Sequence, residues 1–222
     1  MRHVDRCDKP PVLNRNGDRW LEEFKNSGAE RPDSSKYAHQ EVREYLKNMS
    51  HSKCFYCENP LKGKPSEVDH HIEVSVDKDK AFEWENLYLS CHKCNHKQNE
   101  FRIASVETLD PCSDSDDEIK LHLTYNRELI LPVADSVKGD KTIKKYHLDR
   151  EELDYLRIKQ LRKVDEAIED VDSQMIADRR QRMTTEEKNK LLSFTLSSQP
   201  FSYMCEVYLR NRRPMIFTPV SV

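Results

Sequence analysis

Apolar side chains recur at two different spacings along this chain, which predicts helices at both ends and short strands between them. Before residue 54, Trp20, Leu21 and Phe24 indicate a first helix with Asn16 or Asp18 as its N-cap. A second helix is expected to begin with a cap within residues 33–35. Its apolar side would be formed by Tyr37, Val42, Tyr45, Leu46 and Met49.

The middle of the chain has short apolar segments separated by polar residues, a pattern typical of strands and loops. Glu67-Val68 predicts a short strand, and Leu87-Tyr88-Leu89 predicts a second one. The polar stretch from Ile72 to Asp79 predicts a loop between them. We expect a helix to follow from the second of two Cys-x-x-Cys pairs described below.

The remainder of the chain opens with an acidic stretch, Pro111 to Glu118, which its charge density predicts to be a solvated linker. A hairpin is then expected, with Ile119, Leu121 and Leu123 alternating before a turn at 125–128 and a returning strand at 129–131. Helices follow. One carries the stripe Leu161, Val164, Ile168 and Val171, the next has a capping box of Thr184 with Glu187 and ends at Pro200, and the last carries Met204, Val207 and Tyr208.

The composition limits the size of any single core. Of 222 residues, 36% are apolar and 35% are charged, and four glycines argue against a loop-rich β architecture. We expect three regions: 1–53, 54–101 and 102–222. The middle region is too small to be stable without a metal or flanking structure. No apolar stretch approaches membrane length and no signal-peptide pattern opens the chain, so we expect a cytoplasmic protein without membrane contact.

Two Cys-x-x-Cys pairs, Cys54/Cys57 and Cys91/Cys94, bracket the middle region. Four thiolates in two such pairs are a common ligand set of structural zinc, and a reducing cytosol disfavours the alternative of disulfides. The sequence therefore predicts one structural Zn²⁺. Cys7, Cys112 and Cys205 have no partner at ligand spacing and are expected to be ordinary reduced thiols.

A second kind of chemistry is indicated between the cysteine pairs, at Asp69-His70-His71. Hydrolysis of a phosphodiester needs a carboxylate to help hold a divalent cation and a neutral imidazole to take a proton from water. An amide such as Asn86 can orient that imidazole, and Asn95 offers a second hard oxygen ligand. The alternative is that His70 or His71 is a further zinc ligand or an ordinary polar residue.

Taken together, these residues resemble the HNH endonucleases of the ββα-metal type. The resemblance covers Cys54 to about residue 99, where Asp69-His70, Asn86-Leu87 and Cys94-Asn95 match the family pattern. Two positions depart from it, because Glu73 stands where proline is usual and Lys97 comes one position early. The resemblance implies an α+β protein: a small ββα-metal (HNH) core with a zinc knuckle, embedded in a mostly α-helical chain.

The tandem histidines leave the register of this motif open. In one register Asp69 and Asn95 hold a catalytic Mg²⁺ or Mn²⁺, His70 is the general base, and Asn86 orients it. In the other, His70 binds the metal and His71 is the base. We favour the first register, because Ser75 then falls where many family members have serine.

A looser resemblance extends over most of the chain. The opening residues 2–6, Pro10-Pro11 and the later segment His147 to Arg150 are similar to those of PtuB-like HNH proteins, the nuclease subunits of Septu and retron-associated anti-phage systems. That resemblance implies DNA as substrate and an ABC-type ATPase subunit as partner in a hetero-oligomeric complex.

The net charge of −3 is low for an autonomous DNA-binding protein, since phosphate contacts dominate affinity for nucleic acid. Basic residues are clustered locally, for example at Lys138, Lys141, Lys144 and Lys145. Two functions from different classes follow: a metal-dependent endonuclease, or a non-catalytic zinc module that binds a protein partner or nucleic acid. The presence of Asp69, His70, Asn86 and Asn95 favours the nuclease, because a purely structural knuckle needs none of them.

Overall fold

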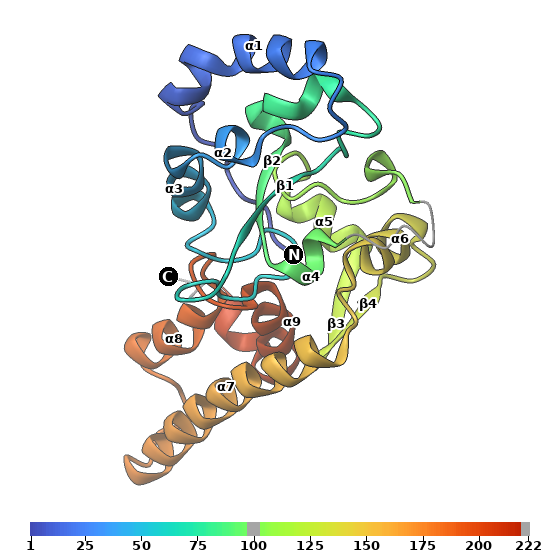
Figure 1. Cartoon of the computed structure of the whole chain (residues 1–222). Coiled ribbons are helices and arrows are strands. Elements are labelled where there is room, and N and C mark those ends of the chain that lie inside the picture. Colours follow the sequence, from blue (N-terminus) through green and yellow to red (C-terminus); the bar gives the residue numbers. More distant parts are fainter. Residues whose placement is uncertain (97–102, 219–222) are drawn as a thin grey trace.

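The computed structural model describes residues 1–96 and 103–218, and its centre is a small antiparallel sheet (Figure 1). Strand β1 (Glu67–His70) pairs with β2 (Leu87–Ser90), with His70 opposite Leu87. Helix α4 (His92–Asn95) follows β2 directly. Both predicted strands are confirmed, as is a helix that starts at the second cysteine pair.

Helix α1 (Pro11–Asn26) covers the loop between β1 and β2. The rings of Trp20 and Phe24 lie 5.9 and 6.5 Å from the ring of Phe82, which belongs to the 3₁₀ helix η1 (Lys78–Phe82) of that loop. The predicted cap at Asn16 or Asp18 is wrong, because Pro10 is the N-cap. A proline in the first turn loses no hydrogen bond and has its φ already set for a helix.

The next predicted helix is two helices, α2 (Ser34–Tyr37) and α3 (Gln40–Met49). The predicted cap is confirmed, since the carboxylate of Asp33 accepts a hydrogen bond from the backbone N–H of Ser35. The helical conformation is interrupted at Ala38, and the side chain of His39 then caps the N-terminus of α3. Val42 and Leu46 of α3 are fully buried, as the helical spacing predicted.

The acidic stretch after residue 110 is ordered, so its interpretation as a linker is wrong. The hydroxyl of Ser115 accepts a hydrogen bond from the N–H of Glu118 and caps helix α5 (Asp116–His122). Three acidic residues in the first turn also stabilise the helix, because they lie at the positive end of its dipole. Ile119 and Leu121 therefore belong to a helix. A hairpin with the predicted returning strand is present, and consists of β3 (Leu123–Asn126) and β4 (Leu129–Pro132). The predicted turn at 125–128 is wrong, because Tyr125 and Asn126 pair with β4 and the turn is confined to residues 127–128.

Helices form the rest of the described chain. They are α6 (Val137–Tyr146), α7 (Glu151–Ala177), α8 (Thr185–Leu192) and α9 (Ser202–Arg212). The predicted stripe on α7 is buried, and the capping box of α8 and the helix at α9 are confirmed. The prediction that Pro200 ends α8 is wrong, because the helix ends at Leu192 and a 3₁₀ turn follows. The later half of α7 extends away from the central sheet, beside α8 (Figure 1).

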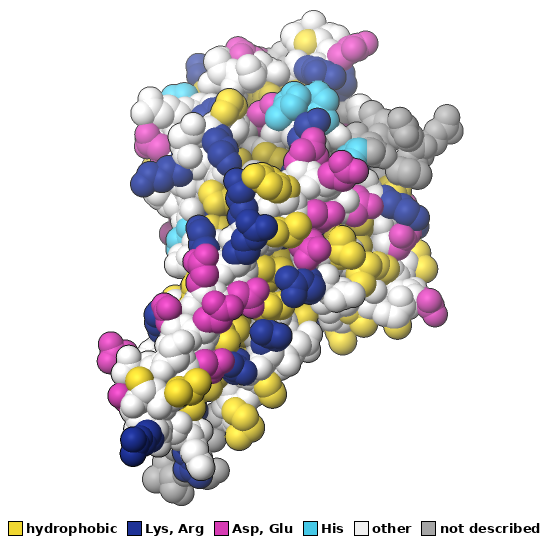
Figure 2. All heavy atoms as spheres, turned by 90° about the horizontal axis from the view of Figure 1, so that it is seen from below, with side chains coloured by type: hydrophobic (Ala, Val, Ile, Leu, Met, Phe, Trp, Pro, Cys, Tyr) yellow, Lys and Arg dark blue, Asp and Glu magenta, His cyan; other side chains and the backbone are white. Residues whose placement is uncertain are grey.

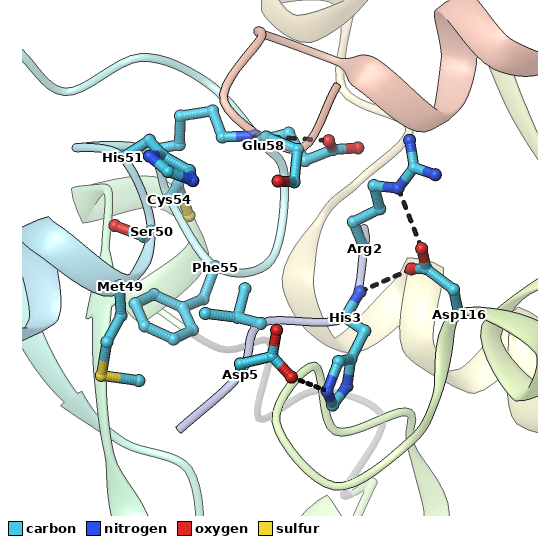
Figure 3. A pocket seen from close by; sticks show the side chains of 13 residues that line it. Arg2, His3, Asp5, Met49, Ser50, His51, Cys54, Phe55, Glu58 and Asp116 are labelled. Atoms are coloured by element: carbon cyan, nitrogen blue, oxygen red, sulfur yellow. Dashed lines mark hydrogen bonds and ion pairs between the residues drawn. The ribbon is translucent and has the colours of Figure 1, made fainter. Parts of the chain in front are cut away.

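The N-terminal segment runs through the middle of the molecule and joins the knuckle to the C-terminal helices. Arg2 forms ion pairs with Asp116 and Glu206. A cavity of about 330 Å³ lies beside this segment, and several charged groups around it form ion pairs, including His3 with Asp5 (Figure 3). One cluster of buried apolar side chains includes residues of all three expected regions. The boundaries of those regions stay a prediction.

Within residues 1–96 and 103–218, no helix is both long enough and apolar enough to cross a membrane.

Candidate active site and metal centre

The four knuckle cysteines come together as one group. Their sulfur atoms all lie within 4.8 Å of one another, and Sγ of Cys57 lies 3.9 Å from Sγ of Cys91. Tetrahedral zinc with bonds of about 2.3 Å holds its sulfurs about 3.8 Å apart, whereas a disulfide needs about 2.05 Å. Burial raises the pKa of the Cys54 and Cys94 thiols, because a buried thiolate is poorly solvated. Four thiolates would therefore be stable here only with a bound cation. The residues present fit a structural zinc.

Arg150 places its guanidinium against this cluster. Its two terminal nitrogens lie 3.6 Å from Sγ of Cys94, 3.7 Å from Sγ of Cys57 and 3.6 Å from Sγ of Cys91. A fork of N–H donors suits a cluster of thiolates, because four thiolates around Zn²⁺ carry an excess of two negative charges. Arg150 is also the N-cap residue of α7 and donates to the carbonyl of His147. The knuckle is thereby fixed to the start of α7.

The two faces of β1 separate the candidate catalytic residues. Side chains alternate along a strand, so Glu67 and Asp69 share one face while His70 points to the other. Asp69 is 4% exposed, and its Oδ2 accepts a hydrogen bond of 2.5 Å from the hydroxyl of Tyr56. That hydroxyl keeps its proton, since burial and the neighbouring Asp69 raise the pKa of Tyr56 well above its ordinary value.

Asn95 lies at the end of α4 and contacts the same face of β1. Its amide Nδ2 donates to the carboxylate of Glu67, two residues before Asp69. A carboxylate can only accept, so this contact fixes which end of the amide faces Glu67 and directs Oδ1 elsewhere. Lys97, the other family position expected here, lies outside the described residues.

His70 is held by the loop between the strands. Its Nε2 lies 2.9 Å from the carbonyl oxygen of Ala81, and its ring centroid lies 4.5 Å from that of Tyr37. The side chain is half-buried. Since a carbonyl can only accept, Nε2 carries a hydrogen, and Nδ1 is therefore the basic nitrogen of the neutral imidazole.

Asn86 acts on the same loop rather than on the imidazole. Its buried amide donates from Nδ2 to the carbonyls of Ile72 and Lys80, both at 3.0 Å, and its Oδ1 accepts from the N–H of Ile72 at 2.7 Å. Lys80 directly precedes Ala81, whose carbonyl faces His70. Asn86 therefore clamps both ends of the loop that sets the orientation of His70.

His71 lies in the interior, with 6% of its surface exposed. Its ring packs beside Tyr88 and Tyr146, and its Nδ1 lies 3.2 Å from the Tyr146 hydroxyl. Its Nε2 is 3.8 Å from Oδ2 of Asp110. Burial alone would raise the pKa of that carboxyl, but His71 and hydrogen bonds from Tyr88 and from nearby groups lower it overall.

Glu73, which stands where the family pattern has proline, contacts the C-terminal region. The buried ammonium of Lys145 on α6 lies 2.7 Å from Oε1 of Glu73 and donates to the carbonyl of Ile103 at the same distance. The hydroxyl of Ser105 lies 3.2 Å from Oε2. In this chain the position thus carries an ion pair that links the loop after β1 to α6.

Sequence reasoning assigned no role to Glu67, Ala81 or Arg150. Glu67 could have been found from strand alternation, because it shares a face with Asp69. The carbonyl of Ala81 has no signal in the sequence, since every residue has a carbonyl. In the sequence Arg150 stands only in the family-like segment that ends with it, and its contact with three sulfurs depends on how α6 and α7 are connected.

Comparison with known proteins supports the resemblance drawn from the motif. The family model of the HNH endonucleases matches residues 54–101. Septu protein PtuB of Bacillus mycoides (strain KBAB4) is 30% identical over 155 residues, covering 55% of this chain and 52% of that protein. Septu protein PtuB of Bacillus thuringiensis is 27% identical over 153 residues, covering 68% of this chain and 55% of that protein. The chain thus spans about half the length of the curated relatives it matches.

Proposed function

We propose that this chain is a metal-dependent endonuclease that hydrolyses phosphodiester bonds of DNA, and that it is the effector subunit of an anti-phage complex with an ATPase partner. One observation carries the catalytic part. Asn86 clamps the loop whose Ala81 carbonyl lies 2.9 Å from Nε2 of His70. A non-catalytic zinc module has no need of an imidazole oriented in this way.

His70 is the general base of this proposal. With Nε2–H donated to Ala81, the Nδ1 lone pair accepts a proton from the attacking water. The hydrogen bond to the carbonyl also stabilises the imidazolium that results, since the carbonyl dipole presents its negative end to the ring. Asn86 and the loop hold the ring in one orientation while the proton moves.

Asp69 and Asn95 would hold Mg²⁺ or Mn²⁺, whose charge would stabilise the pentacovalent transition state and the leaving oxygen. The donor set fits a hard cation, because it consists of a carboxylate and an amide oxygen. Glu67 supports this role, since it binds Nδ2 of Asn95 and leaves Oδ1 as the donor atom. Tyr56 orients the carboxylate of Asp69 through its hydroxyl.

The burial of His71 supports the register in which His70 is the base. A general base needs access to water and to the scissile phosphate. His71 is 6% exposed among Tyr56, Tyr88 and Tyr146, whereas His70 lies at the half-buried end of β1.

The charge distribution supports the need for a partner that captures substrate. Each lysine of the cluster on α6 has a carboxylate partner: Lys138 with Asp114, Lys141 with Glu107, Lys144 with Asp140, and Lys145 with Glu73. Figure 2 shows basic and acidic side chains interspersed over one face of the molecule. Ammonium groups already paired in this way offer little to a phosphate backbone.

The test of the catalytic proposal is DNA cleavage by the purified chain, alone and with a co-purified partner, in Mg²⁺ or Mn²⁺ and in chelator. His70→Ala should abolish nicking of plasmid while zinc content, circular dichroism and partner binding stay unchanged. His51→Ala changes an exposed histidine that precedes the first cysteine pair, and as the matched control it should cleave normally. If the complex with wild-type chain cuts no nucleic acid under any of these conditions, the non-catalytic zinc module becomes the better explanation.

A further inference from the structure

A second group of metal-ligand side chains lies beside the knuckle. It consists of Glu67 at the start of β1, His92 at the start of α4 and His96 directly after the end of α4, and their ligand atoms all lie within 4.8 Å of one another. One member, Glu67, also orients the amide of Asn95 in the chemistry above, whereas the two histidines have no role there. Nδ1 of His92 is 2.7 Å from Oε1 of Glu67, and the two imidazole centroids are 4.0 Å apart. All three side chains are at least partly accessible.

The spacing of these residues suits one ion. Histidines at positions i and i+4 of a helical turn lie on the same face, as in zinc sites built on helices. Bonds of about 2.0–2.2 Å bring tetrahedral ligand atoms to about 3.3 Å from one another, a change that side-chain rotation alone can supply. Asn95 adds a feature of built sites, because it hydrogen-bonds the other oxygen of the Glu67 carboxylate and orients it.

We propose that Glu67, His92 and His96 form a second metal site, selective for a borderline transition metal such as Zn²⁺, Co²⁺ or Ni²⁺. Two imidazoles and a carboxylate suit these metals, whereas Mg²⁺ prefers oxygen ligands. The bound ion would tie α4 to β1, on the strand face that also carries Asp69. The site differs from that of the proposed function, since it uses neither Asp69 nor His70.

The site is tested on the full chain carrying its knuckle zinc, by isothermal titration with Zn²⁺ in excess Mg²⁺. Wild type should take up one further Zn²⁺. His92→Ala and His96→Ala should each weaken that uptake by about tenfold or more, on the scale of a lost ligand or its support. Both histidine side chains are exposed, so the circular dichroism of these variants should stay unchanged. Glu67→Gln should weaken the uptake of Zn²⁺ to a similar extent. His51→Ala is the matched control and should bind as wild type does.

Asp69→Asn separates this proposal from the proposed function. The further Zn²⁺ should still bind to that variant, and its uptake should be independent of any effect on DNA cleavage. Uptake that is lost in Asp69→Asn but kept in His92→Ala would place the ion at the oxygen site instead. That result, or wild-type binding by both histidine variants, or no further uptake by wild type, would overturn the second site.

Discussion

Nε2 of His70 lies 2.9 Å from the carbonyl oxygen of Ala81, eleven residues further along the chain. The contact joins the end of β1 to the loop that leads to β2, and α1 packs on that loop through Phe82. The orientation of the imidazole therefore depends on how the loop is held. Asn86 holds it through three hydrogen bonds to the backbone of Ile72 and Lys80.

Asn86→Ala should lower the rate of DNA cleavage by about 100-fold, the order expected when a catalytic group is mispositioned. The Ile72 and Lys80 carbonyls would lose a buried donor, so stability should fall by about 1–3 kcal/mol as well. Single-turnover rates at saturating DNA and thermal melting measure the two effects separately.

A double variant distinguishes positioning from general damage to the fold. If Asn86 acts through His70, then adding Asn86→Ala to His70→Ala should not lower the residual single-turnover rate of the His70 variant, measured at high enzyme concentration and long times. A further loss in the double variant, equal to the loss in the single one, would show that Asn86 acts independently of the imidazole.

The register of the motif is tested by the two neighbouring histidines. His71→Phe should keep cleaving DNA, because a ring still fills the space beside Tyr88, but it should melt at a lower temperature. Tyr146 and Asp110 would lose a buried partner, at a cost of about 1–3 kcal/mol. His70→Phe should show the opposite pattern. Inactive His71→Phe with wild-type melting, together with active Asp69→Ala, would favour the register in which His71 is the base.

The sequence predicted the parts of this molecule that depend on local periodicity and spacing. The strands at 67–70 and 87–90, the stripe on α7 and the capping box at Thr184 all have local signals, and the structure confirms them. The four cysteines come together as their spacing indicated. The spacing of metal ligands constrains tertiary structure strongly, since both Cys-x-x-Cys pairs must face the same ion although they are far apart in the sequence.

The failures occurred where a local pattern was ambiguous or where the determinant lies far away in sequence. Charge density alone favoured a linker at 111–118, but Ser115 caps a helix there, and Arg2 pairs with Asp116. Arg150 reaches the knuckle from a region 56 residues after Cys94. No local signal could have connected these positions, because the contact depends on the packing of α6 and α7.

The contact between Arg150 and the cysteines predicts slower release of zinc. Arg150→Met should speed transfer of zinc to a chromogenic chelator by about tenfold, and Arg150→Lys should be intermediate, because it keeps the charge without the fork of donors. Arg162→Met changes an exposed arginine on α7 and is the control.

Cys57→Ser should lower both zinc content and melting temperature, since zinc binding is coupled to folding. Unchanged zinc stoichiometry in Cys57→Ser would exclude the knuckle assignment.

Glu58 predicts a specific loss of stability in acid. Burial alone would raise its pKa, but the Met1 ammonium at 3.3 Å, Lys53 at 3.7 Å, the Ser202 hydroxyl and Arg2 lower it from 4.5 to about 2. The stabilisation is therefore present above pH 4.5 and is lost as the pH falls toward 2, by about 2–3 kcal/mol. Glu58→Gln should remove this part of the pH dependence in denaturant titrations. An unchanged acid profile in that variant would assign the effect to other carboxylates.

The paired lysines of α6 predict weak and salt-sensitive binding of DNA by the isolated chain. The four ammonium groups of this cluster already have carboxylate partners, so log Kd against log salt should have a slope of about 2–4 in magnitude, on the scale of about 0.9 per phosphate contact. Fluorescence anisotropy with a labelled duplex, with and without the ATPase partner and ATP, measures this directly. A partner that captures DNA should tighten binding and raise the cleavage rate together. Tight binding and rapid multiple-turnover cleavage by the chain alone at physiological salt would instead indicate a free-standing nuclease, whose substrate contacts lie elsewhere than on the ion-paired surface of α6.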